Sequence, residues 1–193
     1  ADYNIAIGYQ ALTSDTLGSR NVAIGYSALR DQSFSTATNS MNTAVGYQAG
    51  AALTTGISNT LIGGLAGDAL TDADYNTAVG LNALSADTKG NRNVAIGYNT
   101  LRDQNFTTAT SAYNVAVGYA CGASMTTGTN NTLIGGQAGD AITDADGNIA
   151  IGSLALSANT VGSSSTAIGY AALATQNPAT ATSMYNTAVG ASA

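Results

Sequence analysis

The aspartates are the side chains whose spacing comes closest to a chemical site. The phrase Thr-Asp-Ala-Asp occupies residues 71–74 and again 143–146, and each copy follows another aspartate four residues before its first Asp. Alternating carboxylates can supply oxygen ligands to calcium, or the acid and base of a glycosidase. The candidates are Asp68, Asp72, Asp74, Asp140, Asp144 and Asp146.

A structural role for these aspartates is favoured over both kinds of site. Aspartate in a turn accepts hydrogen bonds from nearby backbone amides, which explains its presence without a ligand. No loop collects a full set of calcium ligands, and the calcium-binding nonapeptide repeat of other β-rolls is absent. We therefore expect turns here and assign no metal site, with calcium as the alternative.

The residue inventory argues against catalysis. The sequence has no histidine and a single cysteine, so it offers neither the base of a hydrolase triad nor a zinc site. Gly63-Gly64 ends an expected strand and does not lead into a helix, so it is not a phosphate-binding loop. We expect no catalytic residue, no cofactor and no enzymatic activity.

A five-residue phrase, Asn-[Ile/Val/Thr]-[Ala/Leu]-[Ile/Val]-Gly, sets the architecture because it recurs throughout the chain. Its steps of 17, 21, 17 and 17 residues sum to a 72-residue unit, and such short periods indicate a solenoid. The chain thus reads as one repeat domain, residues 1–193, with units at 4–75, 76–147 and a partial 148–193. Because it begins in mid-repeat, we expect a segment of a longer protein. The phrase starts at Asn4, Asn21, Asn42, Asn59, Asn76, Asn93, Asn114, Asn131, Asn148, Ser165 and Asn186.

Each phrase predicts a short strand. Counting Asn as position 0, positions +1 and +3 are β-branched, +2 is Ala or Leu, and +4 is Gly. A period of two places +1 and +3 on one bulky face and +2 and +4 on a nearly bare one. The sequence predicts an all-β parallel solenoid of about eleven coils. A bare Ala/Gly face suits a subunit interface or a flattened coil.

Three sets of side chains stand out on these coils. The asparagines at position 0 predict a structural ladder between coils. Position +5 is often tyrosine, and outward-facing tyrosines would offer a contact surface for sugars or another protein. Phenylalanine occurs only in the extra loop of the 21-residue coils, where plugging the loop is favoured over ligand contact. The candidate contact residues are Tyr9, Tyr26, Tyr47, Tyr98, Tyr119, Phe34 and Phe106.

Charge and hydropathy limit the partners. The net charge is −6, with only five Lys and Arg residues, so no basic stripe exists to neutralise nucleic acid. No run of 18 apolar residues is present, so we expect no membrane insertion.

The phrase resembles the head repeats of trimeric autotransporter adhesins, through Val22-Ala23-Ile24-Gly25 and Val94-Ala95-Ile96-Gly97. It looks even more like the Asn-Thr-Ala-Val-Gly-Tyr-x-Ala arrays of phage tail fibres, as in residues 42–49. The resemblance covers essentially the whole chain. It implies a left-handed parallel β-roll assembled as a parallel homotrimer, serving as a stiff stalk or head that touches a host surface.

The leading hypothesis is a structural and adhesive fibre segment, most readily a phage tail fibre shaft or head with receptor-contacting loops. A bacterial adhesin head or extracellular filament subunit is the second, and an ice-binding β-solenoid is the third. The expected partners are copies of the chain itself and a host surface glycan or protein. The expected location is the virion, the extracellular space or the cell surface.

Overall fold

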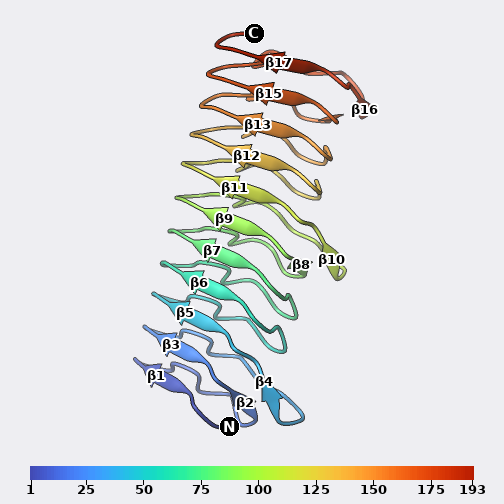
Figure 1. Cartoon of the computed structure of the whole chain (residues 1–193). Coiled ribbons are helices and arrows are strands. Elements are labelled where there is room, and N and C mark those ends of the chain that lie inside the picture. The colour runs from blue at the N-terminus through green and yellow to red at the C-terminus, as the bar shows by residue number, and fades with distance from the viewer.

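The structure, a computed structural model describing all 193 residues, is a rod of stacked coils (Figure 1). Each phrase forms a three-residue strand, and the eleven strands make one parallel sheet in chain order. The predicted all-β parallel solenoid is therefore confirmed. The strands are β1 (Ile5–Ile7), β3 (Val22–Ile24), β5 (Thr43–Val45), β6 (Thr60–Ile62), β7 (Thr77–Val79), β9 (Val94–Ile96), β11 (Val115–Val117), β12 (Thr132–Ile134), β13 (Ile149–Ile151), β15 (Thr166–Ile168) and β17 (Thr187–Val189).

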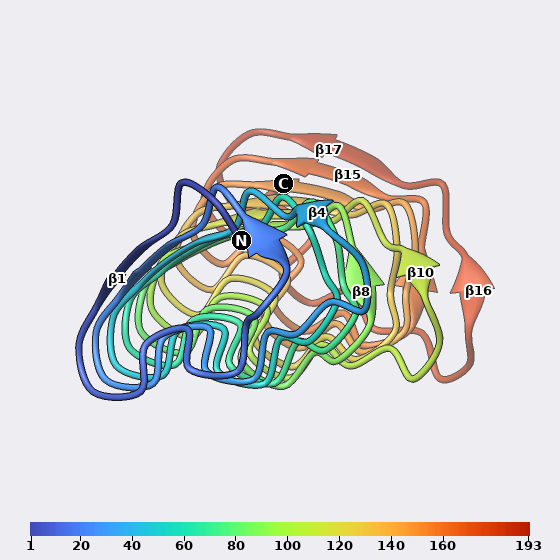
Figure 2. The same ribbon diagram turned by 90° about the horizontal axis from the view of Figure 1, so that it is seen from below.

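The two faces of this sheet have opposite environments. Ala23, at position +2, is 0% exposed, whereas Ile62, at position +3, is 39% exposed. The small side chains therefore point into their own coil, and the β-branched residues point outward. Of the two roles weighed for the Ala/Gly face, this excludes the subunit interface, because the coil's own core covers those alanines. The bare face instead allows a flattened coil, seen end-on in Figure 2.

The interior is filled in two alternating ways. In the first two coils of each unit, position +8 is Leu and position +11 is Asp, Asn or Gln. In the last two, +8 is Gly and +11 is Leu, Met or Ile. We call these the leucine coils and the glycine coils. The leucine coils start at Asn4, Asn21, Asn76, Asn93, Asn148 and Ser165, and the glycine coils at Asn42, Asn59, Asn114 and Asn131.

The extra room at each +8 glycine is taken by neighbouring side chains. A Cβ on Gly50 would lie 2.7 Å from Cδ1 of Leu61, and one on Gly67 would lie 2.8 Å from Cδ2 of the same leucine. Leu61 is the larger +2 residue of the last coil in its unit, and Leu133 is its counterpart. The glycines and these leucines therefore fit as one packing unit.

Tight turns hold the coil corners. The glycine at position +4 has φ between 129° and 144° in every coil, and a Cβ on Gly46 would collide with the carbonyl oxygen of Gly63. Positions −1, +6 and +8 also adopt positive φ, although most of them are not glycine; Arg92 and Leu101 are examples. A side chain in this region costs about 1–2 kcal/mol per residue, which the stacked coils must offset.

The two leucine coils of each unit are joined by a second, two-stranded pairing, and their longer loops bulge on one side (Figure 2). The chain has no helix able to span a membrane. The paired strands are β2 (Gly18–Ser19) with β4 (Thr38–Asn39), β8 (Gly90–Asn91) with β10 (Thr110–Ser111), and β14 (Gly162–Ser163) with β16 (Thr182–Ser183).

Candidate functional site

The asparagines at position 0 form the ladder predicted from the sequence. Oδ1 of Asn42 accepts from the backbone N–H of Asn59 at 2.9 Å, and its Nδ2 donates to the carbonyl of Gly56, 14 residues later in its own coil, at 2.8 Å. In every 17-residue coil, the corresponding amide closes its own coil and joins the next. The buried members, such as Asn42 and Asn114, are 0% exposed, so their role is structural.

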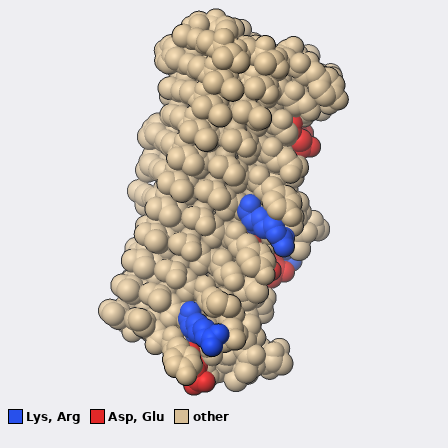
Figure 3. All heavy atoms as spheres, in the orientation of Figure 1, with Lys and Arg blue, Asp and Glu red and all other residues tan.

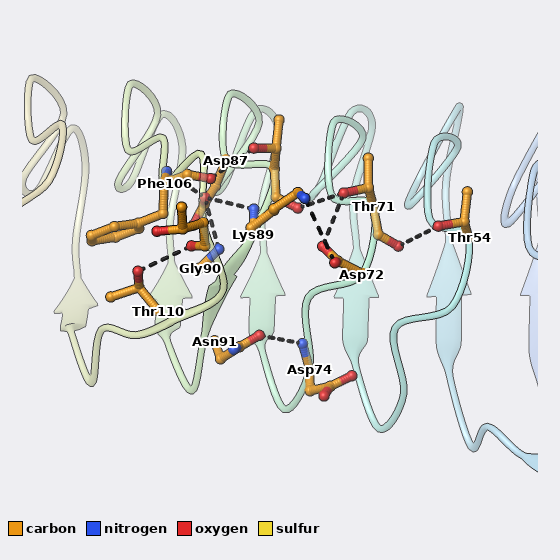
Figure 4. Close-up of polar contacts among 12 residues, drawn as sticks. Thr54, Thr71, Asp72, Asp74, Asp87, Lys89, Gly90, Asn91, Phe106 and Thr110 are labelled. Atoms are coloured by element: carbon orange, nitrogen blue, oxygen red, sulfur yellow. Dashed lines mark hydrogen bonds and ion pairs between the residues drawn. The ribbon is translucent and has the colours of Figure 1, made fainter.

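A carboxylate stands at position +11 in each of the first two units, half-buried in Asp15 and fully buried in Asp87. Asp87 is 0% exposed and has no cation partner. Its Oδ1 accepts from the backbone amides of Gly90 and Phe106 (Figure 4). Its Oδ2 accepts from Nε2 of Gln104 at 2.7 Å. Gln104 in turn accepts from Nδ2 of Asn114 at 2.9 Å. The polar +11 residues of the leucine coils thus connect with the asparagine ladder.

The environment of Asp87 disfavours its charge. Burial raises the pKa of Asp87, and its hydrogen bonds from Gln104 and the backbone oppose that rise. Every hydrogen bond of Asp87 is donated to its carboxylate, so both oxygens have partners and neither is free to exchange a proton with a substrate. The position opens onto no cavity that could admit a substrate, because the structure's only pocket lies at the open end, around residues 171–193.

The third unit replaces two members of this network together. Asn159 stands where the other units have Asp15 and Asp87, and Ser165 stands where they have asparagine at position 0. Gln176 there donates to Oγ of Ser165 at 3.0 Å instead of to the +11 residue of the preceding coil. The change from Asp to Asn and the change from Asn to Ser are therefore geometrically coupled.

The six metal candidates do not come together. No group of three or more acidic, histidine or cysteine residues is placed to hold a metal ion. Asp72 faces Lys89 at 3.8 Å, and Asp74 accepts from the backbone amide of Ile57 and donates its own amide to Asn91 (Figure 4). Asp146 likewise accepts from the amide of Thr129. These contacts are the turn and coil-to-coil bonds expected of structural aspartates.

Asp144 accepts from the hydroxyl of Thr143 at 3.2 Å. The remaining two candidates, Asp68 and Asp140, occupy position +9 of equivalent coils. Burial raises the pKa of each, and Oδ1 of each has no hydrogen-bond partner. Neither has a cation within ion-pair distance. Arginines hold this position in two leucine coils, where Arg30 pairs with Asp31 and Arg102 with Asp103 through two hydrogen bonds each.

The tyrosines at position +5 are exposed and stack on one another. Ring centroids are 5.2 Å apart for Tyr9 and Tyr26, 5.5 Å for Tyr26 and Tyr47, and 5.6 Å for Tyr98 and Tyr119. Stacking covers ring faces inside each run and leaves ring edges to solvent. This column therefore offers aromatic faces only where it is interrupted.

The two phenylalanines do not form a contact surface. Phe34 is 8% exposed and Phe106 is 6% exposed. Phe106 lies against Gly90 of the preceding coil, so it closes the base of the longer loop. Phe34 and Phe106 are therefore removed from the candidate contact residues. Their burial agrees with the other role considered for them, which was to plug the longer loop. The third unit has Pro178 at this position.

A second aromatic contact, which the sequence did not indicate, lies at position −1. The guanidinium of Arg92 sits over the ring of Tyr75 at 5.2 Å and that of Tyr113 at 5.8 Å. Its only signal is that tyrosine and arginine share position −1 in successive coils. Such cation–π contacts contribute about 0.5–1 kcal/mol at exposed sites, so this one is a surface brace.

The outward face of the long sheet is a regular surface that runs through all eleven strands. Every +1 and +3 residue is Ile, Val or Thr, so no charged side chain projects from the strands. In Figure 3 the left-hand part of this face is uncharged, and the charged atoms lie at its right-hand side and near its lower end. Ile96, Ile134 and Ile168 are 37–38% exposed on this face. Comparison of the chain with family models, curated proteins and solved structures finds no match.

Proposed function

We propose that this chain is a segment of an extracellular or virion fibre whose copies associate through the outward Ile/Val/Thr face of the sheet, with a phage tail fibre as the leading assignment. The observation that carries the proposal is this face: two uncharged β-branched residues from each of eleven strands, uncovered in a single chain. Monomeric proteins rarely expose a large contiguous apolar patch.

A closed assembly of three chains suits this surface. Cyclic symmetry lets identical faces of a rod meet along a common axis, and the parallel homotrimer implied by the fibre resemblance is such an arrangement. Each thin coil encloses mainly alanine and single leucines, so association adds apolar burial that one chain lacks. Loops of the longer coils then lie at the margin, where they are free to meet a host surface.

The first experiment is light scattering on the purified chain over a range of concentrations. The proposal predicts a constant mass of three chains. The variant Ile96→Asp places a charge in the middle of the outward face and should shift the mass toward the monomer. The matched control is Thr108→Asp, which puts the same charge on an exposed loop position and should leave the mass unchanged. A wild-type monomer at every concentration would refute the assembly.

Two alternatives keep the fold and change the role. A bacterial adhesin head or extracellular filament subunit would use the same face, and a filament would show a mass that grows with concentration. An ice-binding solenoid is favoured by one observation: the +1 column, which includes Thr43, Thr60 and Thr77 in succession, faces outward in register with Val45, Ile62 and Val79. Thermal hysteresis by the monomer would support that role over the fibre.

A further inference from the structure

The tyrosine column has a long interruption in the second and third units. Tyr119 is followed along the rod by Gly136, then Ser153, then Tyr170. Backbone bonds fix this alignment, because the amides one residue after Gly136, Ser153 and Tyr170 donate to the carbonyls of Tyr119, Gly136 and Ser153 at 2.8–3.1 Å. With strands about 4.8 Å apart, the two rings stand roughly 14 Å from each other.

The interruption leaves ring faces open. Tyr119 is 60% exposed and Tyr47, which also precedes a glycine, is 55% exposed. Tyr26 and Tyr98, which have a large side chain at position +5 on both sides, are 46% and 43% exposed. The difference is the ring face turned toward the missing side chain, so the end rings offer an apolar face that the stacked ones do not.

The two interruptions differ in a way that selects one of them. The gap over Gly64 is bordered by Leu81, whose Cδ1 would lie 3.2 Å from a Cβ on that glycine, so the leucine covers it. The gap over Gly136 is bordered by Ser153, whose hydroxyl would lie 3.9 Å from such a Cβ. Space for a flat ligand therefore remains between Tyr119 and Tyr170, and a hydroxyl lines it.

Polar groups surround this gap. Gln137 and Ser153 are exposed, so an amide and a hydroxyl are available beside the ring of Tyr119. Asp140 lies in the same coil, four residues after Gly136, and has no cation partner. Burial raises the pKa of Asp140, and a hydrogen bond from the side chain of Gln137 opposes that rise, so the carboxylate lies beside the amide of Gln137.

We propose that the interruption between Tyr119 and Tyr170 binds a pyranose ring of a glycan. The apolar face of the sugar stacks on the open face of Tyr119, and its hydroxyls bond to Ser153, Gln137 and the carboxylate of Asp140. A purely apolar ligand would leave these polar groups unpaired, which favours a sugar. The site deepens the proposed fibre role by naming the class of surface that the rod contacts.

The test is saturation-transfer NMR with a panel of neutral hexoses, N-acetylhexosamines and their disaccharides at millimolar concentration. Wild-type protein should transfer saturation to at least one sugar. Gly136→Tyr completes the column and should weaken that binding about tenfold, equivalent to about 1.4 kcal/mol. The backbone accepts this change, because Gly136 has no positive φ and tyrosine fills the same position in six other coils. Tyr119→Ala should weaken binding similarly.

Gly64→Tyr is the matched control, because it fills the gap that Leu81 already covers, and it should leave binding unchanged. Light scattering on the same samples separates this inference from the fibre proposal. If Gly136→Tyr loses sugar binding while its mass stays equal to that of the wild type, the result supports the site whatever the oligomeric state. No transfer to any sugar in the panel would overturn the inference. A change of mass in Gly136→Tyr without sugar binding would also overturn it, because the gap would then be a contact between chains.

Discussion

The leucine coils and the glycine coils enclose similar cross-sections with different side chains. In a leucine coil, Leu at +8 fills the interior and leaves +11 to a polar residue such as Asp87 or Gln104. In a glycine coil, +8 has no side chain, and Met125 or Ile142 at +11 fills the interior with Leu133 at +2. The large side chain moves from +8 to +11, and packed cores tolerate such exchanges best when they keep the total volume.

The largest expected effect on stability comes from changing the apolar side chains that fill the two kinds of coil. Leu133→Ala removes the side chain that occupies the room over Gly122 and Gly139, and should lower the free energy of unfolding by about 2–5 kcal/mol. The opposite change, Ala78→Leu, adds volume where Leu84 already fills the interior, and should cost about 1–3 kcal/mol. Denaturant unfolding followed by circular dichroism measures both. Tolerance of Ala78→Leu would show that the two coil types are interchangeable.

A smaller effect on stability is expected from changing the polar residues inside the leucine coils. Asp87→Asn should cost about 1–2 kcal/mol, because an amide would then face the donor Nε2 of Gln104. Asn93→Ser should cost a similar amount, because it removes the ladder acceptor for the amide of Asn114. The double variant copies Asn159 and Ser165 of the third unit, where the glutamine turns to the serine hydroxyl.

The double variant should therefore be more stable than the sum of the single changes predicts, by about 1 kcal/mol. The double-mutant cycle measures this coupling from three unfolding curves and the wild-type curve. Strict additivity would mean that the joint replacement in the third unit has no energetic basis in this network.

The smallest expected effect is a dependence on pH. Because burial raises the pKa of Asp87 above the ordinary value of 3.8, the folded state binds its proton more tightly than the unfolded chain does. Its contribution to stability is complete below the unfolded pKa and is lost as pH rises through the folded pKa. The unfolding free energy of the wild type, relative to Asp87→Asn/Asn93→Ser, should therefore fall from acid toward neutral pH. A relative rise over that range would contradict the shift.

The sequence was sufficient for the fold and for part of the surface. Period-two β-branching separates the faces of each strand, and the fixed period aligns like residues, so the sheet and the asparagine ladder were predictable. The sequence did not show which face of each strand turns toward the coil interior, because alanine suits a narrow coil and a close interface equally well. Alignment of the tyrosines in one column followed from the period, whereas their exposure and the burial of Phe34 and Phe106 required the structure.

The alternation of coil types was harder to predict for a physical reason. Positions +8 and +11 compensate each other only because a positive φ at +8 turns Leu84 or Leu101 into the same interior that +11 faces. No residue preference signals that conformation, since leucine rarely adopts it. The buried pair of Asp87 and Gln104 follows from the same geometry, and its one sequence signal is that +11 is polar only where +8 is Leu.

The asparagine ladder also favours one order in which the coils can fold. A completed 17-residue coil holds its own asparagine in place through Nδ2, as Asn114 does with the carbonyl of Gly128, and leaves Oδ1 aimed at the coil that comes next. In a chain synthesised from its N-terminus, each finished coil is therefore a template that presents an acceptor to residues not yet made. We expect the coils to fold one after another from the N-terminal end, each on the coil before it.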